Sequence, residues 1–322
     1  MMKRVFKIVA GPLVALAVGL ALLGLAKPDH AGIPAGVAGQ VLSIDGVQIR
    51  YVQKGEGRDL LLIHGTPSSL EEWAPVFDRW AGKYRVTAYD RPGHGYSGPP
   101  AGETGIDYNA QVARRLMEEL HLHDVLVVGH SYGGAVALKL AADDNSPATA
   151  FLIVASTVYP SGGFHGALGT LLRLPLLGRG VAVVLEELGG GMVRKSMEQA
   201  FHPDERLIPP GYIERKKEIL LQPKVTLTLA QEMKAHPSQL GALVTRYPSI
   251  KRPVSIVVGS DDAPHRVEGG QRLAREIPSA HLTVLEHAGH MLQFTRPDEL
   301  TGLVAAALAT PANPAKSRAP AD

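Results

Sequence analysis

The sequence VLVVGHSYGGAVALKLAA, at residues 125–142, carries three consecutive signals. Its first four residues are all apolar, which is typical of a strand buried on both faces of a parallel sheet. Its last eight residues are rich in alanine, which favours a helix. Between them Ser131 has a glycine two residues before it and another two residues after it, Gly129 and Gly133. Because a strand-to-helix turn closes tightly only without side chains at those two places, the pattern predicts that Ser131 stands on a sharp turn at the carboxyl edge of a sheet.

Short apolar runs of the same kind recur through the chain and alternate with helical stretches. The predicted strands are Leu60–Ile63, Val86–Tyr89, Val125–Val128, Ala150–Val154, Val254–Val258 and Leu282–Leu285. The predicted helices are Leu70–Trp80, Ile106–His121, Tyr132–Asp143, Arg266–Ile277 and Pro297–Leu308. A hairpin that turns at Asp45-Gly46 precedes them. This alternation predicts an α/β fold with a doubly wound, mostly parallel sheet.

The alternation stops in the middle of the chain, where the sequence becomes helical and is interrupted by Gly and Pro. This segment is too long for a loop, so residues 157–250 are predicted to form an inserted helical lid. The core of the domain is then built from two parts, residues 41–156 and residues 251–309. The Pro- and Ala-rich residues 310–322 are predicted to be a disordered tail.

Residues 1–27 have the features of a membrane-targeting segment. Three cations, Lys3, Arg4 and Lys7, precede an uncharged and mostly apolar run at Ile8–Ala26. Nineteen helical residues cover about 28 Å, which is close to the thickness of the hydrocarbon layer of a bilayer. Because basic residues stay on the cytoplasmic side, the segment predicts a transmembrane anchor that places the rest of the chain outside the cytoplasm. Residues 28–40 are expected to form a flexible linker.

Two other interpretations of this segment stay open. Gly24 and Ala26 form a small-residue pair that a signal peptidase can cut, in which case the mature protein is exported. Alternatively, the run is a buried core helix, although nothing further along the chain is suited to cover a helix that is apolar on all sides. Anchoring and cleavage both place the domain outside the cytoplasm.

The composition excludes several other classes of protein. The 322 residues include 33 Lys and Arg and 31 Asp and Glu, and the first 27 residues hold four of the cations and none of the acids. The remainder is therefore close to neutral and lacks the excess of basic residues that nucleic-acid binding requires. The chain has no Cys, which excludes disulfides, catalytic thiols and thiolate metal sites. The sequence has no metal-ligand motif or dinucleotide-binding motif, so we expect neither a metal nor another cofactor.

Five motifs, in order along the chain, resemble those of the α/β-hydrolase superfamily. They are HGTPSS at His64–Ser69, YDRPGHGYS at Tyr89–Ser97, GHSYGG at Gly129–Gly134, VVGSDD at Val257–Asp262 and HAGHMLQFTRPDEL at His287–Leu300. The resemblance covers Val41–Leu308 and is to the lid-bearing branch of epoxide-hydrolase-like and esterase-like proteins. It implies an enzyme that needs no cofactor.

The superfamily orders its catalytic residues along the chain as nucleophile, acid and histidine. Ser131 is the expected nucleophile. By resemblance the second histidine of HAGH, His290, is the expected base, and His287 is the alternative. Family members keep the acid three residues after the glycine that ends a strand. This spacing indicates Asp262, and the adjacent Asp261 is the alternative.

Acyl transfer also needs two N–H donors for the oxyanion that forms on the substrate. One is the backbone amide of Tyr132, the residue after the nucleophile. The other is expected in the loop after the strand Leu60–Ile63, at Thr66, because Pro67 has no N–H. Three further histidines in the motifs are expected to be structural, namely His64, His94 and His130.

The serine separates this chain from the epoxide hydrolases and haloalkane dehalogenases that it resembles, because those enzymes use an aspartate nucleophile. A Ser-His-Asp triad instead predicts hydrolysis of a carboxylic ester or related acyl bond through an acyl-enzyme. The Leu- and Val-rich lid predicts an apolar small-molecule acyl substrate. Two alternatives use the same triad, a perhydrolase or haloperoxidase-like reaction and the hydrolysis of a C–C bond. A non-catalytic binding module is a third alternative.

Overall fold

The computed structural model describes residues 15–309 except residues 28, 30–31, 161–165 and 176. In this part of the chain eight strands form one sheet in the order β1-β2-β4-β3-β5-β6-β7-β8. They are β1 (Gln40–Ile44), β2 (Val47–Lys54), β3 (Asp59–Ile63), β4 (Arg85–Tyr89), β5 (Val125–His130), β6 (Ala148–Val154), β7 (Val254–Gly259) and β8 (Ala280–Leu285). β2 pairs antiparallel with β1 and β4, and all other neighbours are parallel. The sheet confirms the predicted doubly wound α/β fold, and each predicted strand lies within an observed one.

The predicted hairpin is present at the edge of this sheet. Ile44 pairs with Val47 across the turn, as the last pair of the β1–β2 ladder. The two turn residues, Asp45 and Gly46, both have positive φ angles, 47° and 82°. A turn of this kind twists in the same sense as the strands that it joins, which explains why the short Asp-Gly sequence suffices.

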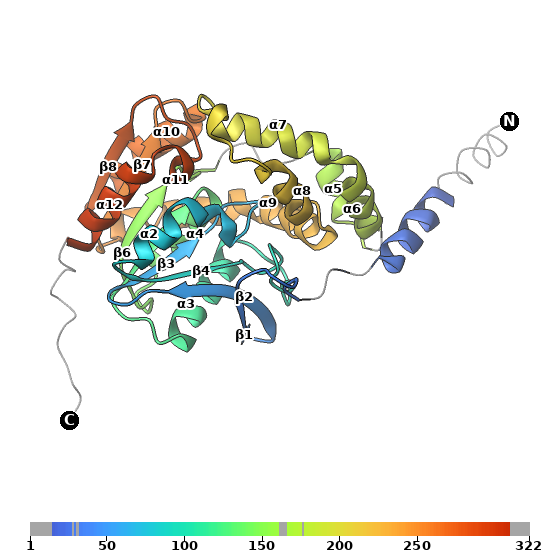
Figure 1. The fold of residues 1–322 in the computed structure, drawn as a ribbon, viewed down its shortest axis with the longest axis horizontal. Coiled ribbons are helices and arrows are strands. Elements are labelled where there is room, and N and C mark those ends of the chain that lie inside the picture. The colour runs from blue at the N-terminus through green and yellow to red at the C-terminus, as the bar shows by residue number, and fades with distance from the viewer. Residues whose placement is uncertain (1–14, 28, 30–31, 161–165, 176, 310–322) are drawn as a thin grey trace.

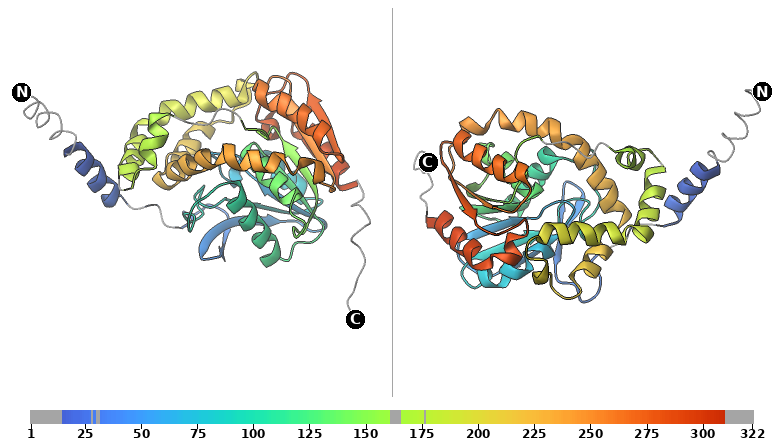
Figure 2. Two further views of the ribbon diagram at one scale, coloured as in Figure 1. Left: turned by 180° about the vertical axis from the view of Figure 1, so that it is seen from behind. Right: turned by 90° about the horizontal axis from the view of Figure 1, so that it is seen from above.

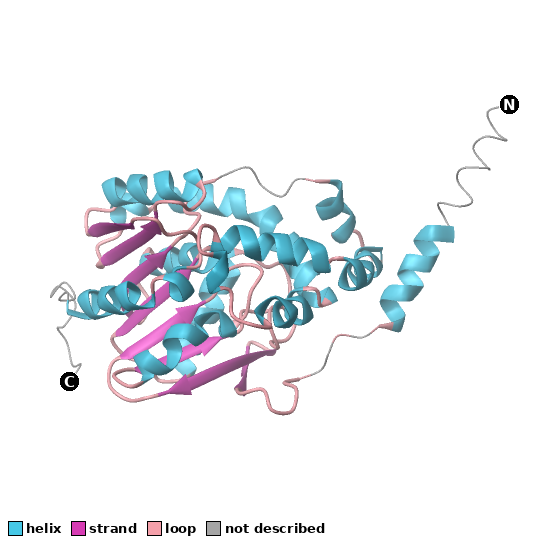
Figure 3. Ribbon diagram, turned by 45° about the horizontal axis from the view of Figure 1, so that its top comes forward, coloured by secondary structure: helices cyan, strands magenta, loops and turns pink. Residues whose placement is uncertain are grey.

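Helices cover both faces of the sheet (Figure 3), and an apolar core lies on each face. One core is covered by α3 (Ile106–Glu119), α4 (Tyr132–Ala141) and α10 (Pro264–Glu276). The other is covered by η1 (Leu70–Trp73), α2 (Ala74–Ala81), α11 (Leu292–Thr295) and α12 (Pro297–Ala309). Adjacent residues of a strand point to opposite faces, so Leu61 lies in the first core and Leu62 in the second. This double burial is the reason that the central strands are apolar throughout.

Between β6 and β7 the described residues form a helical insertion, which we call the lid. It contains α5 (Ala167–Leu172), α6 (Leu177–Leu188), α7 (Gly190–Phe201), η2 (Glu205–Leu207), α8 (Tyr212–Leu220), α9 (Pro223–Val244) and η3 (Tyr247–Ser249). These helices gather on one side of the core (Figures 1 and 2). α5, α6 and α9 pack together through a small apolar cluster of their own, around Leu172, Ala182 and Ala230.

Residues 15–26 form a helix that contacts α6. Arg179 of α6 donates hydrogen bonds to the backbone carbonyls of Gly24 (2.8 Å) and Lys27 (2.6 Å). A Cβ atom at Gly24 would lie 2.9 Å from the backbone nitrogen of Gly180, so the two segments approach closely. Among the described residues no helix is both long enough and apolar enough to cross a membrane, which leaves the predicted spanning anchor without support. Residues 8–14 of the predicted run, and the predicted tail at 310–322, lie outside the described residues.

Candidate active site

Ser131 lies on a strained turn between the end of β5 and the start of α4. Its backbone has a φ of 53° and a ψ of −118°, a conformation that residues with a side chain rarely adopt. The turn closes because both flanking glycines lack a side chain. A Cβ atom at Gly129 would overlap the carbonyl of Gly133, and one at Gly133 would overlap the carbonyl of Ile63. Strain of this kind persists where the surrounding structure holds it, and it is frequent at active sites.

His290 and Asp262 form a hydrogen-bonded pair near this turn. His290 follows β8 and Asp262 follows β7, which is the next strand in the sheet. His290 Nδ1 lies 2.9 Å from Asp262 Oδ2. The other carboxylate oxygen, Asp262 Oδ1, accepts hydrogen bonds from the amide of Ala263 (2.7 Å) and from Arg266 (2.6 Å). Both oxygens of Asp262 therefore have donors, which fixes the orientation of the imidazole.

The surroundings of this pair set its protonation. Burial alone would raise the pKa of Asp262, but His290 and Arg266 hold that pKa well below its usual range. Burial and, after it, Arg266 lower the pKa of His290 to about 4, although Asp262 acts in the opposite direction. At neutral pH Asp262 is thus a carboxylate and His290 a neutral imidazole. A neutral imidazole can accept a proton, as a general base must.

The two alternative residues lie in different surroundings. Asp261 is exposed and accepts a hydrogen bond from the hydroxyl of Ser260 (3.0 Å). His287 is also exposed, and it takes part in the loop through its backbone, whose amide donates to Ser260 Oγ (2.9 Å). Neither side chain takes part in the hydrogen bond between His290 and Asp262.

The loop after β3 lies directly against Ser131. A Cβ atom at Gly65 would be 3.0 Å from Ser131 Cβ, so a side chain at this position would crowd Ser131. The Gly65 amide donates to Glu72 Oε1 (3.1 Å). The Thr66 hydroxyl donates to Glu232 Oε2 (2.7 Å), which fixes the side chain of the residue whose amide has the predicted oxyanion role. The amide of Tyr132 is the first of α4, and the first amides of a helix have no partner within it.

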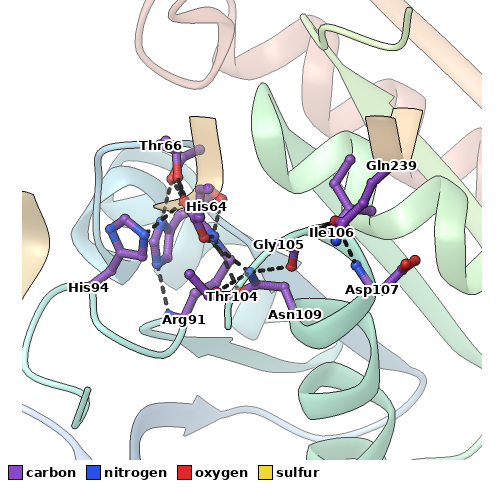
Figure 4. Close-up of polar contacts among 12 residues, drawn as sticks. His64, Thr66, Arg91, His94, Thr104, Gly105, Ile106, Asp107, Asn109 and Gln239 are labelled. Atoms are coloured by element: carbon purple, nitrogen blue, oxygen red, sulfur yellow. Dashed lines mark hydrogen bonds and ion pairs between the residues drawn. The ribbon is translucent and has the colours of Figure 1, made fainter. Parts of the chain in front are cut away.

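Glu232 connects the lid to this loop. It lies on α9 and is completely buried. Figure 4 shows the residues that surround it, and its hydrogen-bond donors are Thr66, Arg91, His94 and Asn109. Burial would raise the pKa of Glu232, but Arg91 and His94 hold that pKa well below its usual range. The lid therefore supplies a carboxylate that fixes Thr66 from outside the core. The expectation that His94 is structural agrees with this contact.

His130, which the sequence predicts to be structural, contacts His290, the predicted base. Its Nε2 lies 3.0 Å from the carbonyl oxygen of His290, and the two rings are tilted with their centroids 4.6 Å apart. Its Nδ1 lies 2.7 Å from Glu72 Oε1, a buried carboxylate of η1. Both ring nitrogens face oxygen atoms. His130 therefore positions the backbone of His290.

Ser131, Thr66, Asp262 and His290 all line one cavity of about 970 Å³. Part of its wall comes from the lid, through α7 and α8. The charged residues of the lining are Glu72, Lys195, Glu198, Glu205, Lys216, Asp261, Asp262 and Arg266. Apolar side chains such as Met197, Tyr212 and Met291 also line the cavity, and the apolar substrate stays a prediction. The Leu and Val residues on which that prediction rested pack among the lid helices or face outward, as Leu188 does, so they do not form the wall.

Four residues that sequence reasoning missed have central contacts here. They are Glu72, Lys216, Glu232 and Arg266. Arg266 could have been found, since it follows Asp262 by four residues at the start of a predicted helix, where side chains at that spacing meet. The other three carry no signal, because burial of a charge depends on how the lid meets the core. No group of three or more His, Asp or Glu residues in the described part of the chain is arranged to hold a metal.

Comparisons with known proteins agree with this geometry. A model of the alpha/beta hydrolase family matches residues 60–303. The chain is 27% identical over 256 residues to the magnesium-chelatase 30 kDa subunit of Rhodobacter capsulatus, which covers 77% of this chain and 86% of that one. It is 41% identical over 110 residues, 34% of its length, to the dihydrolipoyllysine-residue acetyltransferase component of the acetoin cleaving system of Cupriavidus necator, but it spans only 29% of that relative.

Among solved structures, Est816, described as an N-acyl homoserine lactone degrading enzyme, is similar with a TM-score of 0.64 and 27% identity over 83% of this chain and 99% of that one. The family model spans both parts of the core and the lid between them, and so includes every residue that surrounds Ser131. This chain is therefore an enzyme that belongs to the alpha/beta hydrolase family.

Proposed function

We propose that this enzyme hydrolyses a carboxylic ester or a lactone through an acyl-enzyme on Ser131. The Ser131 hydroxyl attacks the substrate carbonyl carbon while its proton passes to His290 Nε2. The carbonyl oxygen, now negatively charged, accepts hydrogen bonds from the amides of Tyr132 and Thr66. Collapse of this intermediate releases the alcohol, which takes the proton from His290. Water then attacks the acyl group in the same way, releases the acid and restores Ser131.

The observation that carries this proposal is the hydrogen bond between His290 Nδ1 and Asp262 Oδ2, at the cavity that Ser131 faces. It keeps a proton on Nδ1 and so makes Nε2 the acceptor for the serine proton. The name of Est816 supports a lactone or ester as the substrate class, since both are carboxylic esters in chemical terms.

The proposal is tested with a fluorophosphonate probe and a panel of p-nitrophenyl esters and lactones. We expect the probe to label the protein and at least one panel member to be hydrolysed. Ser131→Ala should abolish both signals. Ser249→Ala, which removes an exposed serine of η3, is the control and should keep both. Labelling that persists in Ser131→Ala excludes Ser131 as the nucleophile.

Two further assays separate the alternative reactions on the same residues. Peroxide-dependent halogenation without ester hydrolysis would indicate a haloperoxidase-like enzyme. One relative, from Rhodococcus erythropolis and 33% identical over 121 residues, is named a non-heme haloperoxidase. Cleavage of a vinylogous diketone without ester hydrolysis would indicate a C–C bond hydrolase. Either result replaces ester hydrolysis as the function.

For the location of the enzyme, we propose that the domain acts outside the cytoplasm. The support is the sequence alone, with three cations before the apolar run Ile8–Ala26. Cell fractionation combined with N-terminal sequencing tests this. Mature protein that starts near Lys27 indicates cleavage, whereas the full chain in the membrane fraction indicates anchoring. Full-length protein in the cytoplasmic fraction contradicts the proposal.

A further inference from the structure

Lys216 is a buried cation in the wall of the catalytic cavity. It lies on α8, between Arg215, which is exposed, and Lys217, which is partly exposed. Only 3% of Lys216 is exposed. Its Nζ donates a hydrogen bond to Ser68 Oγ (2.8 Å) and lies 5.3 Å from the centre of the Tyr212 ring. Ser68 and Tyr212 line the same cavity, so the ammonium group borders the space that Ser131 faces.

The carboxylates around Lys216 have closer partners. Among the described residues no carboxylate oxygen lies within 4.0 Å of Lys216 Nζ. Glu72 pairs with His130, and both Glu71 and Asp90 pair with Arg50. An ammonium group has three N–H donors, and the hydrogen bond to Ser68 uses one of them. Burial lowers the pKa of Lys216, while Glu72, Glu71 and Asp90 act in the opposite direction at longer range.

Three carboxylates of the cavity wall also have partners of their own. Asp262 pairs with Arg266, Glu72 with His130, and Glu205 with His202. Lys216 differs from these groups, because it is a buried charge that meets a hydroxyl rather than an opposite charge. Burying a charge in this way is costly unless a partner arrives. A negatively charged group of a ligand in the cavity would be that partner.

We propose that Lys216 and Ser68 form a subsite for a carboxylate of the substrate. The inference rests on the proposed hydrolysis and specifies its substrate class, namely esters or lactones that carry a second, free carboxylate. The spacing along the chain sets an upper limit on the distance between Ser68 and Ser131. Ser68 follows Gly65, which contacts Ser131, by three residues, and three residues span at most about 10 Å. A dicarboxylic acid of four to six carbons, esterified at one end, has a similar length.

The kinetic test compares the p-nitrophenyl monoester of adipic acid with neutral p-nitrophenyl heptanoate. We expect kcat/KM of the wild-type enzyme to favour the anionic ester by about tenfold or more, since hydrogen bonds between charged groups are worth that much. Lys216→Met should abolish this preference and Lys216→Arg should keep part of it. Lys217→Met removes the same charge from the same helix at a residue outside the cavity, so it is the matched control and should keep the full preference. A preference that persists in Lys216→Met, or an equal loss on both esters, overturns the subsite.

A binding measurement separates this inference from the proposed reaction. Calorimetry with the monomethyl ester of adipic acid on Ser131→Ala requires no turnover. We expect the monomethyl ester to bind Ser131→Ala, and its Kd to be at least about tenfold higher for Ser131→Ala/Lys216→Met. We also expect the Kd for Ser131→Ala to rise with added salt. If Ser131 proves not to be the nucleophile while this dependence on Lys216 holds, the reaction is wrong and the subsite stands. If the ester does not bind, or if neutral methyl heptanoate binds as well, the subsite is wrong whether or not Lys216→Met folds.

Discussion

Glu232 and Lys216 are both buried charges on lid helices, and their surroundings differ in one respect. Glu232 accepts hydrogen bonds from four residues of the core. Lys216 makes one hydrogen bond among the described residues, to Ser68, and borders the cavity. A charge whose partners all belong to the protein holds the folded arrangement together, whereas a charge with one neutral partner beside a cavity is suited to a ligand. The number and kind of partners thus distinguish a structural charge from a binding charge.

The adjacent residues Asp261 and Asp262 also differ in their partners, and this difference can be tested as the choice of the catalytic acid. Asp262 has donors on both oxygens and Asp261 is exposed. We expect Asp262→Asn to lower kcat by about three to four orders of magnitude, because the amide no longer holds the correct tautomer of His290. Asp261→Asn should cost less than about tenfold. Ester hydrolysis at saturating substrate measures both, and the reverse order would show that Asp261 is the acid.

Removing the charge of Glu232 should have the largest effect on stability. Glu232→Gln leaves the buried Arg91 without its ionic partner, and breaking a buried pair costs about 3–5 kcal/mol. Lys216→Met should lower the free energy of unfolding by less than half as much, since no carboxylate depends on Lys216 for its closest contact. Urea unfolding followed by circular dichroism measures the two changes. Equal losses would break the comparison between the two charges.

The pH dependence of kcat/KM should show the influence of Arg266 on His290. His290 acts only when it is neutral, so activity rises with pH through its pKa, which burial and Arg266 lower to about 4. Arg266→Gln removes one lowering influence, so the pKa of His290 should rise and the acid limb should move to higher pH, by about half a unit or more. Arg272→Gln, on the exposed side of the same helix, is the control and should leave the limb in place. A limb that is unchanged, or that moves to lower pH, contradicts this role of Arg266.

The fold could be predicted because its signals are local. The apolar strands and the pair of glycines around Ser131 depend on neighbouring residues, and the observed overlaps at Gly129 and Gly133 are those that the spacing implies. The acid and the base rest on resemblance and on a count from Gly259, and the distance between Asp262 and His290 agrees with that count.

The contacts between the lid and the core could not be predicted. Lys216 stands in the sequence ERKKE, where every residue is charged and nothing marks the one that turns inward. Glu232 meets Arg91 and His94 across more than a hundred residues of chain, so the pairing depends on how α9 lies on the core. The apolar substrate that the lid composition suggested stays a prediction, because composition does not reveal which side of a helix faces a cavity.

The contact between Arg179 and the segment before the domain has a consequence for evolution. Arg179 bonds to the backbone carbonyls of residues 24 and 27, and every residue type offers a carbonyl. These two bonds therefore make no demand on the side chains of the segment. Three positions do make one, because Lys27 pairs with Glu186 (2.8 Å), Asp29 pairs with Arg179 (3.0 Å), and even a methyl group at position 24 would approach the backbone of Gly180. Homologous chains that keep Arg179 should therefore retain a glycine at position 24 and the charges at positions 27 and 29, while the other side chains of the segment vary.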